Sequence, residues 1–494
     1  MSRLAAGVLM PGFPGTQAPD WMERALADGV AGVCLFAENT PDVATARALT
    51  DELRARRPGL VVALDQEGGD VTRLQAGHGS SLPGAAALGA AGDEALTRAC
   101  GRALGRLLAL AGVDLDLAPC LDVAAEPLNP VIGVRAFGAD TDVVRRHGGA
   151  FAAGLRDAGV ACCGKHYPGH GSTRLDSHLD LPVLDVDPTL LQARDLAPFE
   201  ALLGCGAVDA VMTGHLVVPD FGTDPATLSR WATEAIRGTG FDGAILTDAL
   251  GMRAITDRLG FGEACVRALE AGADLLLLDA PHLRDAEATY AEALDAVEAA
   301  LATGRLGEDA LRASAGRAAR LQRREATAPA DLAVTIAAAE GELGRLGQVA
   351  AARALSTRGD VVLAGPPLLL DIRRRTSYAA GRSSGAFAEA VRRTWVAAEV
   401  VVPLDEAEAL ATLDVAPVGH DVVVLTRDAR SHDEEGALLG SVLAARPDAL
   451  VVHTGVAQAA PDVPRLACCL GNGAANADAL VARLGAATAG GGGA

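Results

Sequence analysis

One stretch of the sequence decides the fold and suggests the site, residues 160–178, which read VACCGKHYPGHGSTRLDSH. Its first residues, Val160 to Gly164, are small and apolar, as is typical of a buried strand. Pro168, Gly169 and Gly171 then break any helix, because proline lacks an amide donor and glycine lowers helix propensity. Three histidines, a lysine, an arginine and an aspartate lie in the last fifteen positions. We therefore expect a polar loop that leaves the end of a strand, where catalytic side chains are commonly held.

Similar apolar runs recur through the first 305 residues, and amphipathic stretches separate them. The eight expected strands are 7–10, 32–36, 60–64, 113–118, 160–164, 207–212, 243–247 and 273–278. The stretches between them include expected helices at 42–56, 95–111, 143–158 and 285–302. Strands that alternate with helices predict a parallel sheet with crossover helices, and eight such units predict an N-terminal (β/α)8 barrel of the TIM type. A doubly wound open sheet is the alternative that the pattern leaves open.

The C-terminal part of the chain repeats this alternation in a shorter form. Residues 325–331 contain a proline among small residues and predict a linker, and a helix is expected at 336–355. Further strands are expected at 361–364, 400–402, 422–425, 450–452 and 466–470, with helices at 435–445 and 475–484. This pattern predicts a smaller α/β sandwich of three layers, αβα. We expect a barrel domain at 1–325, a linker and helix at 326–345, the sandwich domain at 346–489 and a disordered glycine-rich tail at 490–494.

Bulk properties narrow the class of protein. A chain of 494 residues exceeds one ordinary core, so two domains are expected. The net charge of −20 argues against nucleic acid or an anionic membrane as a partner. The sequence shows neither a membrane-spanning run nor a signal peptide, so we expect a cytoplasmic monomer or homodimer. The nine cysteines show no CxxC spacing. The adjacent pairs Cys162-Cys163 and Cys468-Cys469 lie in apolar runs, which predicts buried free thiols rather than a disulfide framework.

Ionisable residues follow five of the expected barrel strands. They are Asp65 to Glu67, Asp122, Lys165 with His166, His215 and Asp248. Active sites of such barrels lie at the carboxyl ends of the strands. We therefore expect these side chains to meet at one mouth of the barrel.

Two of these positions suggest catalytic chemistry. The Asp248 carboxylate ends a strand and could attack a carbon electrophile or stabilise a cation, and the alternative is an N-cap of the next helix. Asp176 precedes His178 by two residues, so its carboxylate could fix one imidazole tautomer and make His178 a proton carrier near neutral pH. The alternative for this pair is a solvated dyad on a loop. Gly169 and Gly171 would allow that loop to move over a substrate.

Four further residues have the donors and acceptors that a polyhydroxylated ligand needs, namely Asp65, Arg135, Lys165 and His166. The alternatives are a strand-terminal turn for Asp65 and an ion pair with a surface carboxylate for Arg135. The histidines also suggest a metal hydrolase as an alternative. Such an enzyme needs closely spaced metal ligands, such as a His-x-His pair from an early strand. The first expected strand supplies none. We expect no metal and no cofactor.

Taken together, the motifs resemble those of the family-3 glycoside hydrolases, in the two-domain form of the β-N-acetylglucosaminidase branch. They occur in family order and cover most of the first domain; the matching segments are 64–69 (LDQEGG), 117–123 (LAPCLDV), 131–138 (VIGVRAFG), 165–171 (KHYPGHG), 176–178 (DSH) and 246–252 (LTDALGM). One departure is Asp70, which stands where the family commonly has arginine after Glu-Gly-Gly.

The resemblance implies a retaining exo-β-N-acetylglucosaminidase that works through a covalent glycosyl-enzyme intermediate. By the motif match Asp248 is the nucleophile, His178 with its partner Asp176 is the acid/base, and Asp65, Arg135, Lys165 and His166 hold sugar hydroxyls. The implied substrate is a terminal β-linked N-acetylglucosamine on peptidoglycan (muropeptide) fragments, as in cell-wall recycling. The alternatives are a β-N-acetylglucosaminide phosphorylase with the same Asp/His machinery, a β-glucosidase and a sugar-binding protein without enzymatic activity.

Overall fold

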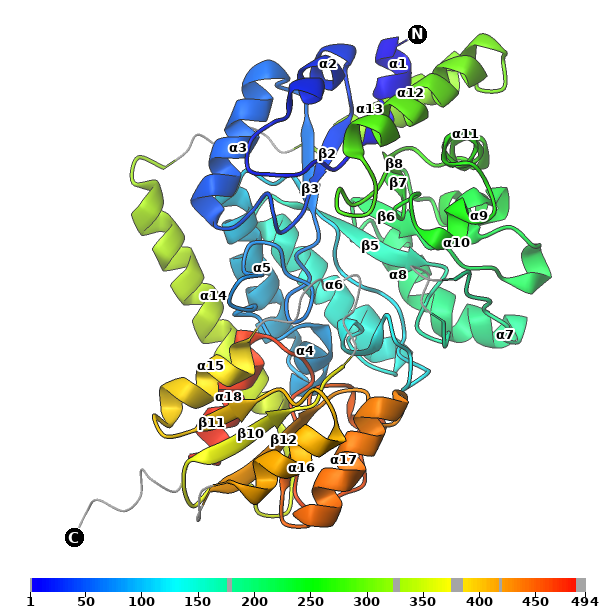
Figure 1. Cartoon of the computed structure of the whole chain (residues 1–494). Coiled ribbons are helices and arrows are strands. Elements are labelled where there is room, and N and C mark those ends of the chain that lie inside the picture. The colour runs from blue at the N-terminus through cyan, green and yellow to red at the C-terminus, as the bar shows by residue number, and fades with distance from the viewer. Residues whose placement is uncertain (1, 176–179, 323–328, 375–384, 417–419, 486–494) are drawn as a thin grey trace.

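Two parallel sheets organise the chain in the computed structural model, which describes residues 2–175, 180–322, 329–374, 385–416 and 420–485 (Figure 1). The first sheet contains β1 (Leu9–Met10), β2 (Gly32–Leu35), β3 (Val61–Leu64), β4 (Leu115–Asp116), β5 (Ala161–Tyr167), β6 (Ala210–Thr213), β7 (Ala244–Thr247) and β8 (Leu276–Leu277). Strands β2 to β7 pair in chain order and in parallel, and β1 pairs in parallel with β8. All eight strands fall within or overlap the expected ones.

Backbone hydrogen bonds close these strands into a ring. The amide of Cys34, in β2, donates to Pro11 O beside β1 at 3.0 Å, and the Thr247 amide, in β7, donates to Leu275 O beside β8 at 3.1 Å. The (β/α)8 barrel predicted from the alternation is therefore confirmed, and the open-sheet alternative is wrong.

Successive residues of each barrel strand face two different cores, because side chains alternate across a strand. In β3, Val61 and Ala63 join the cluster inside the barrel, whereas Val62 and Leu64 pack with the surrounding helices. Both sides are apolar and buried, which explains why the strands read as continuous apolar runs rather than as alternating ones.

Four long crossover helices begin where the sequence predicted, each at an aspartate N-cap. They are α3 (Val43–Arg56), α5 (Glu94–Leu110), α6 (Thr141–Asp157) and α12 (Ala286–Ala302). Each cap side chain accepts a backbone amide hydrogen at 2.8 or 2.9 Å, which satisfies a donor that the helix itself leaves open.

The other helices of this half complete the outer layer. They are α1 (Ser2–Ala6), α2 (Asp20–Asp28), α4 (Ala85–Ala91), α7 (Pro188–Leu190), α8 (Ala197–Gly204), α9 (Arg230–Gly238), α10 (Arg253–Thr256), α11 (Phe261–Ala271) and α13 (Glu308–Ala319).

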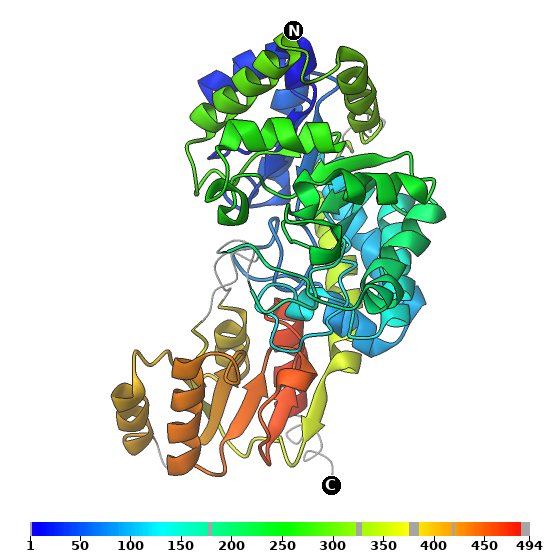
Figure 2. The ribbon, with the colours of Figure 1, turned by 90° about the vertical axis from the view of Figure 1, so that its right-hand side faces the viewer.

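The second sheet has the order β11-β10-β12-β13-β14-β9. Its strands are β9 (Ser356–Arg358), β10 (Pro367–Asp371), β11 (Glu399–Val401), β12 (Asp421–Thr426), β13 (Leu450–His453) and β14 (Leu466–Cys468), and all pair in parallel except β9. Helices α15 (Ala386–Thr394) and α18 (Ala474–Leu484) pack on one face, and α16 (Glu406–Asp414) and α17 (Asp433–Ala445) pack on the other (Figure 2). The predicted αβα sandwich is confirmed.

One expected strand of this domain is wrong. Residues 361–364 are not a strand, although Val361 and Leu363 are buried. The Leu363 amide donates to Leu484 O at the end of α18, and the Ala364 amide donates to the Asp421 carboxylate. The backbone amides of Leu363 and Ala364 therefore bond to a helix end and to a side chain, not to a neighbouring strand. The strand of this region, β10, begins later, at Pro367.

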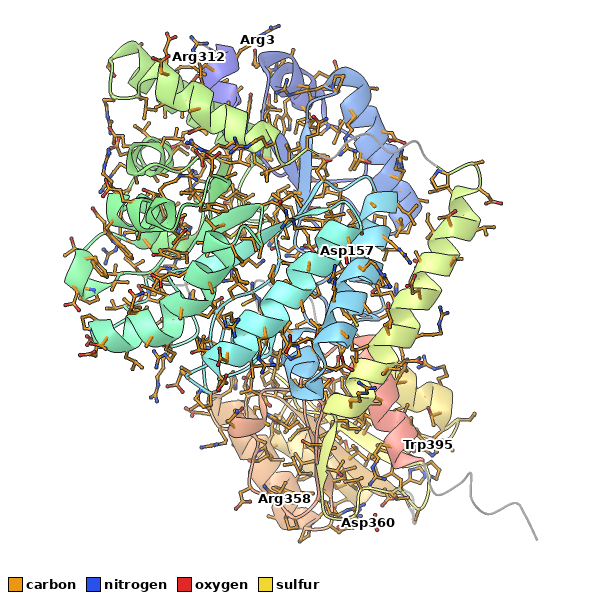
Figure 3. All side chains as sticks on the ribbon, turned by 180° about the vertical axis from the view of Figure 1, so that it is seen from behind. Arg3, Asp157, Arg312, Arg358, Asp360 and Trp395 are labelled. Atoms are coloured by element: carbon orange, nitrogen blue, oxygen red, sulfur yellow. The ribbon has the colours of Figure 1, made fainter. Side chains whose placement is uncertain are left out.

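One helix, α14 (Leu332–Ala354), connects the two domains without a break. It packs against α4 and α5 of the barrel and against α18 of the sandwich. Figure 3 shows α14 beside α5 on the back of the molecule. In that view Arg3 and Arg312 mark the barrel end of the molecule, and Arg358 and Asp360 mark the opposite end. The expected boundary between residues 345 and 346 falls inside this helix, so the division into domains stays a prediction. Most of the expected linker and the 490–494 tail lie outside the described residues.

The cysteine prediction is confirmed for the adjacent pairs, whose four thiols are free and buried. All nine cysteines lie in the described ranges and are free, and one of them, Cys205, is exposed. A search of the described helices finds none with the length and apolarity needed to cross a membrane.

Candidate active site

The strand-end residues of the barrel gather at one mouth, as the order of strands predicts. Asp65 follows β3, Asp122 lies after β4, and Asp248 follows β7. Lys165 and His166 lie within β5 rather than on the loop after it, which corrects the expected strand end at residue 164.

Strand β5 extends because its neighbours continue to accept and donate hydrogen bonds beyond Gly164. The Lys165 amide donates to Pro119 O at 3.1 Å, and Lys165 O accepts from the Leu121 amide at 2.6 Å. On the other side Tyr167 pairs with Thr213 of β6, with a register shift after Gly164. The polar loop therefore begins at Pro168.

Five charged side chains form a buried group at this mouth, which we call the mouth cluster: Asp65, Glu67, Arg73, Arg135 and Lys165. Lys165 Nζ lies 2.6 Å from Asp65 Oδ1 and 2.7 Å from Glu67 Oε1. Arg135 donates two parallel hydrogen bonds to Glu67, from Nη2 to Oε1 at 2.7 Å and from Nε to Oε2 at 2.9 Å. Arg73 Nη2 lies 3.2 Å from Asp65 Oδ2. Each carboxylate thus forms ion pairs with two cations.

The mouth cluster keeps its charges at neutral pH. Burial alone would raise the pKa of Glu67, but the Arg135 and Lys165 charges hold that pKa well below its usual range. Burial would likewise lower the pKa of Lys165, and the Asp65 and Glu67 carboxylates raise it instead. Burial would also raise the pKa of Asp65, but the Lys165 and Arg73 charges lower it below its usual value. Fixed charges of this kind suit the recognition of a polar ligand.

The Asp122 carboxylate orients the His166 ring by a hydrogen bond. Its Oδ2 lies 2.8 Å from His166 Nδ1, and its Oδ1 accepts from the His170 amide at 2.6 Å. Although burial would raise it, the pKa of Asp122 is held low by His166 and by these hydrogen bonds. An ionised carboxylate only accepts hydrogen bonds, so Nδ1 of His166 carries a proton. His166 Nε2 is then directed toward Arg135 Nη2, 3.4 Å away.

Cys120, Asp122 and His166 also bring three potential metal-ligand atoms within 4.8 Å of one another. These atoms already bond to each other, since Cys120 Sγ donates to Asp122 Oδ2 at 3.0 Å and His166 Nδ1 donates to the same oxygen. Burial raises the pKa of the Cys120 thiol well above its usual value, which disfavours the thiolate that a metal binds. The contacts favour a hydrogen-bonded network over a metal centre.

Asp248 lies half-buried at the end of β7 and on the same mouth. Its amide donates to Thr213 O at 3.0 Å, and its Oδ1 accepts from the Ala249 amide at 2.8 Å. Its charge acts on the His170 ring and on the Cys163 thiol, both on or just after β5. The N-cap of α10, the next helix, is Met252, so the N-cap alternative for Asp248 is wrong.

The two residues of the expected acid/base pair, Asp176 and His178, lie outside the described residues. The chain leading to them is held from the loop after β4. Asn129 Nδ2 donates to His170 O and to Thr173 O, each at 2.9 Å, and Arg174 Nε lies 2.7 Å from Glu126 Oε2.

His170 is buried at the base of the same loop. Burial lowers its pKa to about 4, so the ring is neutral at physiological pH. Its Nδ1 lies 2.8 Å from Thr173 Oγ1. These contacts indicate that His170 supports the loop.

Of the residues expected to bind a sugar, Asp65, Lys165, His166 and Arg135 all lie at this mouth. Glu67 was expected at the mouth but was given no role in binding, and Arg73 was not expected there. Glu67 carried one signal, because it follows the third strand together with Asp65, two positions further along the chain. Nothing in the sequence showed that its carboxylate would join Arg135 to Lys165 over long separations.

A (β/α)8 barrel with buried carboxylates and cations at its mouth is an arrangement that glycoside hydrolases use. Residues 15–321 match the model of the glycosyl hydrolase family 3 N-terminal domain. The chain therefore belongs to glycosyl hydrolase family 3.

Relatives with known names and structures agree with this membership. The chain is 40% identical over 283 residues to the beta-hexosaminidase of Alkalilimnicola ehrlichii, which covers 55% of this chain and 80% of that protein. The structure of a family 3 beta-N-acetylglucosaminidase from Paenibacillus sp. str. FPU-7 superimposes with a TM-score of 0.86 and 31% identity, over 98% of this chain and 96% of that one. NagZ from Neisseria gonorrhoeae, in complex with N-trifluoroacetyl-D-glucosamine, matches with a TM-score of 0.58 and 29% identity, over 69% and 98%.

Proposed function

We propose that this chain is a retaining exo-β-N-acetylglucosaminidase that removes terminal β-linked N-acetylglucosamine through a covalent glycosyl-enzyme intermediate. The observation that carries the proposal is the position of Asp248, at the end of β7 on the mouth where Asp65 and Lys165 form an ion pair. The names of the hexosaminidase relatives support the acetamido sugar.

In the proposed first step an Asp248 oxygen attacks the anomeric carbon as the bond from that carbon to the leaving oxygen breaks. The imidazolium of His178, paired with Asp176, gives its proton to the leaving oxygen. In the second step the neutral imidazole accepts a proton from water, water attacks the anomeric carbon and the bond to Asp248 breaks. The sugar leaves with the β configuration that it had in the substrate.

The mouth cluster would hold the sugar while this happens. Asp65 has the most exposed side chain of the four expected binding residues, at 19%, against 7% for Arg135 and His166 and 2% for Lys165. Asp65 is therefore the residue best placed to accept hydrogen bonds from sugar hydroxyls. Lys165, held between two carboxylates, keeps Asp65 ionised and in place.

We further propose that the natural substrates are peptidoglycan fragments and that the enzyme works in the cytoplasm, as a monomer or a homodimer, without a metal or other cofactor. Fragments of that kind carry the β-linked N-acetylglucosamine that the proposed chemistry needs. The acidic surface argues against nucleic acid and membrane partners.

The test is incubation of the purified chain with the 4-nitrophenyl β-glycosides of N-acetylglucosamine and of glucose, each with and without phosphate. We expect release from the N-acetylglucosaminide, independent of phosphate, with retention of configuration by proton NMR of the first product. Release that requires phosphate, with sugar 1-phosphate as product, would identify a phosphorylase instead. Preference for the glucoside would identify a β-glucosidase, and no release from either would contradict the proposal.

A further inference from the structure

Asp70, the departure noted in the barrel motif, makes its contacts with the second domain. Its Oδ1 accepts from the Asn472 amide at 2.7 Å, and its Oδ2 lies 3.3 Å from Asn472 Nδ2 and forms an ion pair with Arg427 Nη1. The Asp70 side chain is only 3% exposed. Arginine, common at this position in the family, would bring a second cation against Arg427.

The contacts continue through a group that we call the domain clamp: Asp70, Arg373, Arg427 and Asn472. Arg373 Nη1 donates to Asn472 Oδ1 at 2.5 Å, and Arg373 is itself held by Asp371. Arg373, Arg427 and Asn472 follow β10, β12 and β14, at the carboxyl ends of these parallel strands. Asp70 contacts Arg427 and Asn472 directly and Arg373 through Asn472. One barrel carboxylate therefore connects to the ends of three strands of the second sheet.

The loop that carries Arg427 is fixed in its own domain. The buried Glu435 carboxylate, on α17, accepts from the amides of Arg427 and Asp428 at 2.6 and 2.8 Å. Close backbone packing accompanies the clamp, since a Cβ at Gly473 would lie 2.9 Å from Ser80 O, and the Ala475 amide donates to Ser80 O at 3.2 Å. The second domain thus meets the barrel through rigid, specific contacts.

On the barrel side, Asp70 lies on the segment 65–73, which supplies Asp65, Glu67 and Arg73 to the mouth cluster. It follows Glu67 by three residues and precedes Arg73 by three. Gln66 closes this segment on itself, because its Oε1 accepts from the Arg73 amide at 2.7 Å and its Nε2 donates to Thr72 Oγ1 at 2.7 Å. A displacement of Asp70 would therefore move Glu67 and Arg73 together.

We propose that Asp70 is a positioning residue through which the second domain holds the substrate-binding segment 65–73 in place. This proposal rests on the proposed glycosidase function. It assigns the second domain a part in substrate affinity, exerted through the clamp. Asp70 itself need not touch the substrate.

The test is a double-mutant cycle with Asp70→Asn, Arg427→Gln and both together, assayed on 4-nitrophenyl N-acetyl-β-glucosaminide. Asp70→Asn keeps the shape of the side chain and removes its charge. We expect each single variant to raise KM about tenfold and to change kcat less than about twofold, because the segment that binds sugar shifts while Asp248 does not. The double variant should be no worse than the worse single one, because both remove one interaction.

A second readout does not depend on turnover. Hydrogen exchange of backbone amides should accelerate both in residues 65–73 and in residues 470–476 of the Asp70→Asn protein. If the parent lacks glycosidase activity, the proposed function fails, and the exchange measurement still decides whether the clamp couples the two segments. Should Asp70→Asn fail to fold, Asp70→Glu provides the same comparison with the charge retained and its reach altered.

The matched control is Glu342→Gln, which removes an ion pair to Arg106 that also joins α14 to the barrel but lies away from the mouth. It should leave KM, kcat and the exchange of residues 65–73 unchanged. Unchanged KM and exchange in both single clamp variants would overturn the proposal. Effects on KM that multiply in the double variant, or a loss confined to kcat, would also overturn it.

Discussion

The two parallel sheets of this molecule use the same structural position for different purposes. At the carboxyl ends of the barrel strands, Asp65, Lys165 and Asp248 face a shared mouth. At the carboxyl ends of the second sheet, Arg373 donates to Asn472, and Arg427 and Asn472 both contact a barrel carboxylate, Asp70. The comparison teaches that polar residues at strand ends do not by themselves indicate catalysis. What distinguishes the barrel is a continuous chain of four ion pairs that joins the five charged side chains of the mouth cluster.

The largest expected effect is a loss of kcat when a strand-end carboxylate of the barrel is changed, compared with the same change in the second sheet. Asp248→Asn removes the proposed nucleophile and should lower kcat by about 10⁴-fold, measured on the aryl N-acetylglucosaminide. The counterpart in the second sheet is Asp428→Asn, since Asp428 follows β12 by two residues. That variant should keep kcat within about twofold. Equal losses in the two variants would break the comparison.

The next effect concerns the buried charges. Glu67→Gln leaves Arg135 and Lys165 without their shared carboxylate, so we expect kcat/KM to fall by about 10²-fold and the free energy of unfolding to fall by about 3–5 kcal/mol. Steady-state kinetics and urea unfolding measure the two quantities. A stable, fully active variant would show that the mouth cluster is not a functional unit.

Each sheet also contributes one buried, neutral histidine, His170 beside β5 and His453 at the end of β13. Burial lowers the pKa of each to about 4, from 6.5. Between these values the unfolded chain binds more protons than the folded one, so stability falls as the pH falls. We expect a loss of about 2 kcal/mol per histidine between pH 7 and pH 5, measured by urea unfolding.

The part of this acid-induced loss of stability that comes from the second sheet can be removed by His453→Gln. The glutamine side-chain amide can still donate to Val456 O. About half of the acid-induced loss of stability should disappear. The pH profile of kcat should not change, because His453 lies in the second sheet, away from the proposed nucleophile. A shifted profile would contradict the assignment of chemistry to the barrel alone.

The smallest expected effect comes from outside both strand-end groups. Glu342→Gln removes the solvent-accessible ion pair between α14 and Arg106, and should lower the free energy of unfolding by less than about 0.5 kcal/mol. A loss as large as that of Glu67→Gln would show that burial does not separate the two kinds of ion pair.

The sequence predicted the barrel well because buried parallel strands are apolar on both faces. Each of the eight runs therefore stood out against the amphipathic helices between them. The second sheet was predicted less accurately. Strand β10 begins at Pro367, the second of two prolines after Gly365, and such a run is typical of a turn. Val361 to Ala364, in contrast, has the composition of a strand, but its amides bond to a helix end and to a side chain.

The site was predicted as far as single residues at strand ends can predict it. Lys165 and His166 were expected just beyond a strand and lie within it, because bonds to the β4 side extend β5. The ion pairs of Glu67 and Asp70 could not be predicted, for a different reason. Their partners, Arg135 and Arg427, are 68 and 357 residues away, and no local pattern encodes such pairings. The roles of Asp248, Asp176 and His178 stay predictions.

The continuous helix between the domains has a practical consequence for anyone who wishes to express the barrel by itself. The family match ends at residue 321, but Ala339, Leu343 and Ala350 of α14 belong to the apolar core around the barrel. At Gly347 the helix lies so close to the Ser81 carbonyl that even a methyl group would not fit. A fragment that ends at residue 321 lacks α14, so the apolar barrel surface that α14 covers would be exposed to water and to other chains. The shortest soluble fragment should instead retain all 23 residues of the helix, about 35 Å of it.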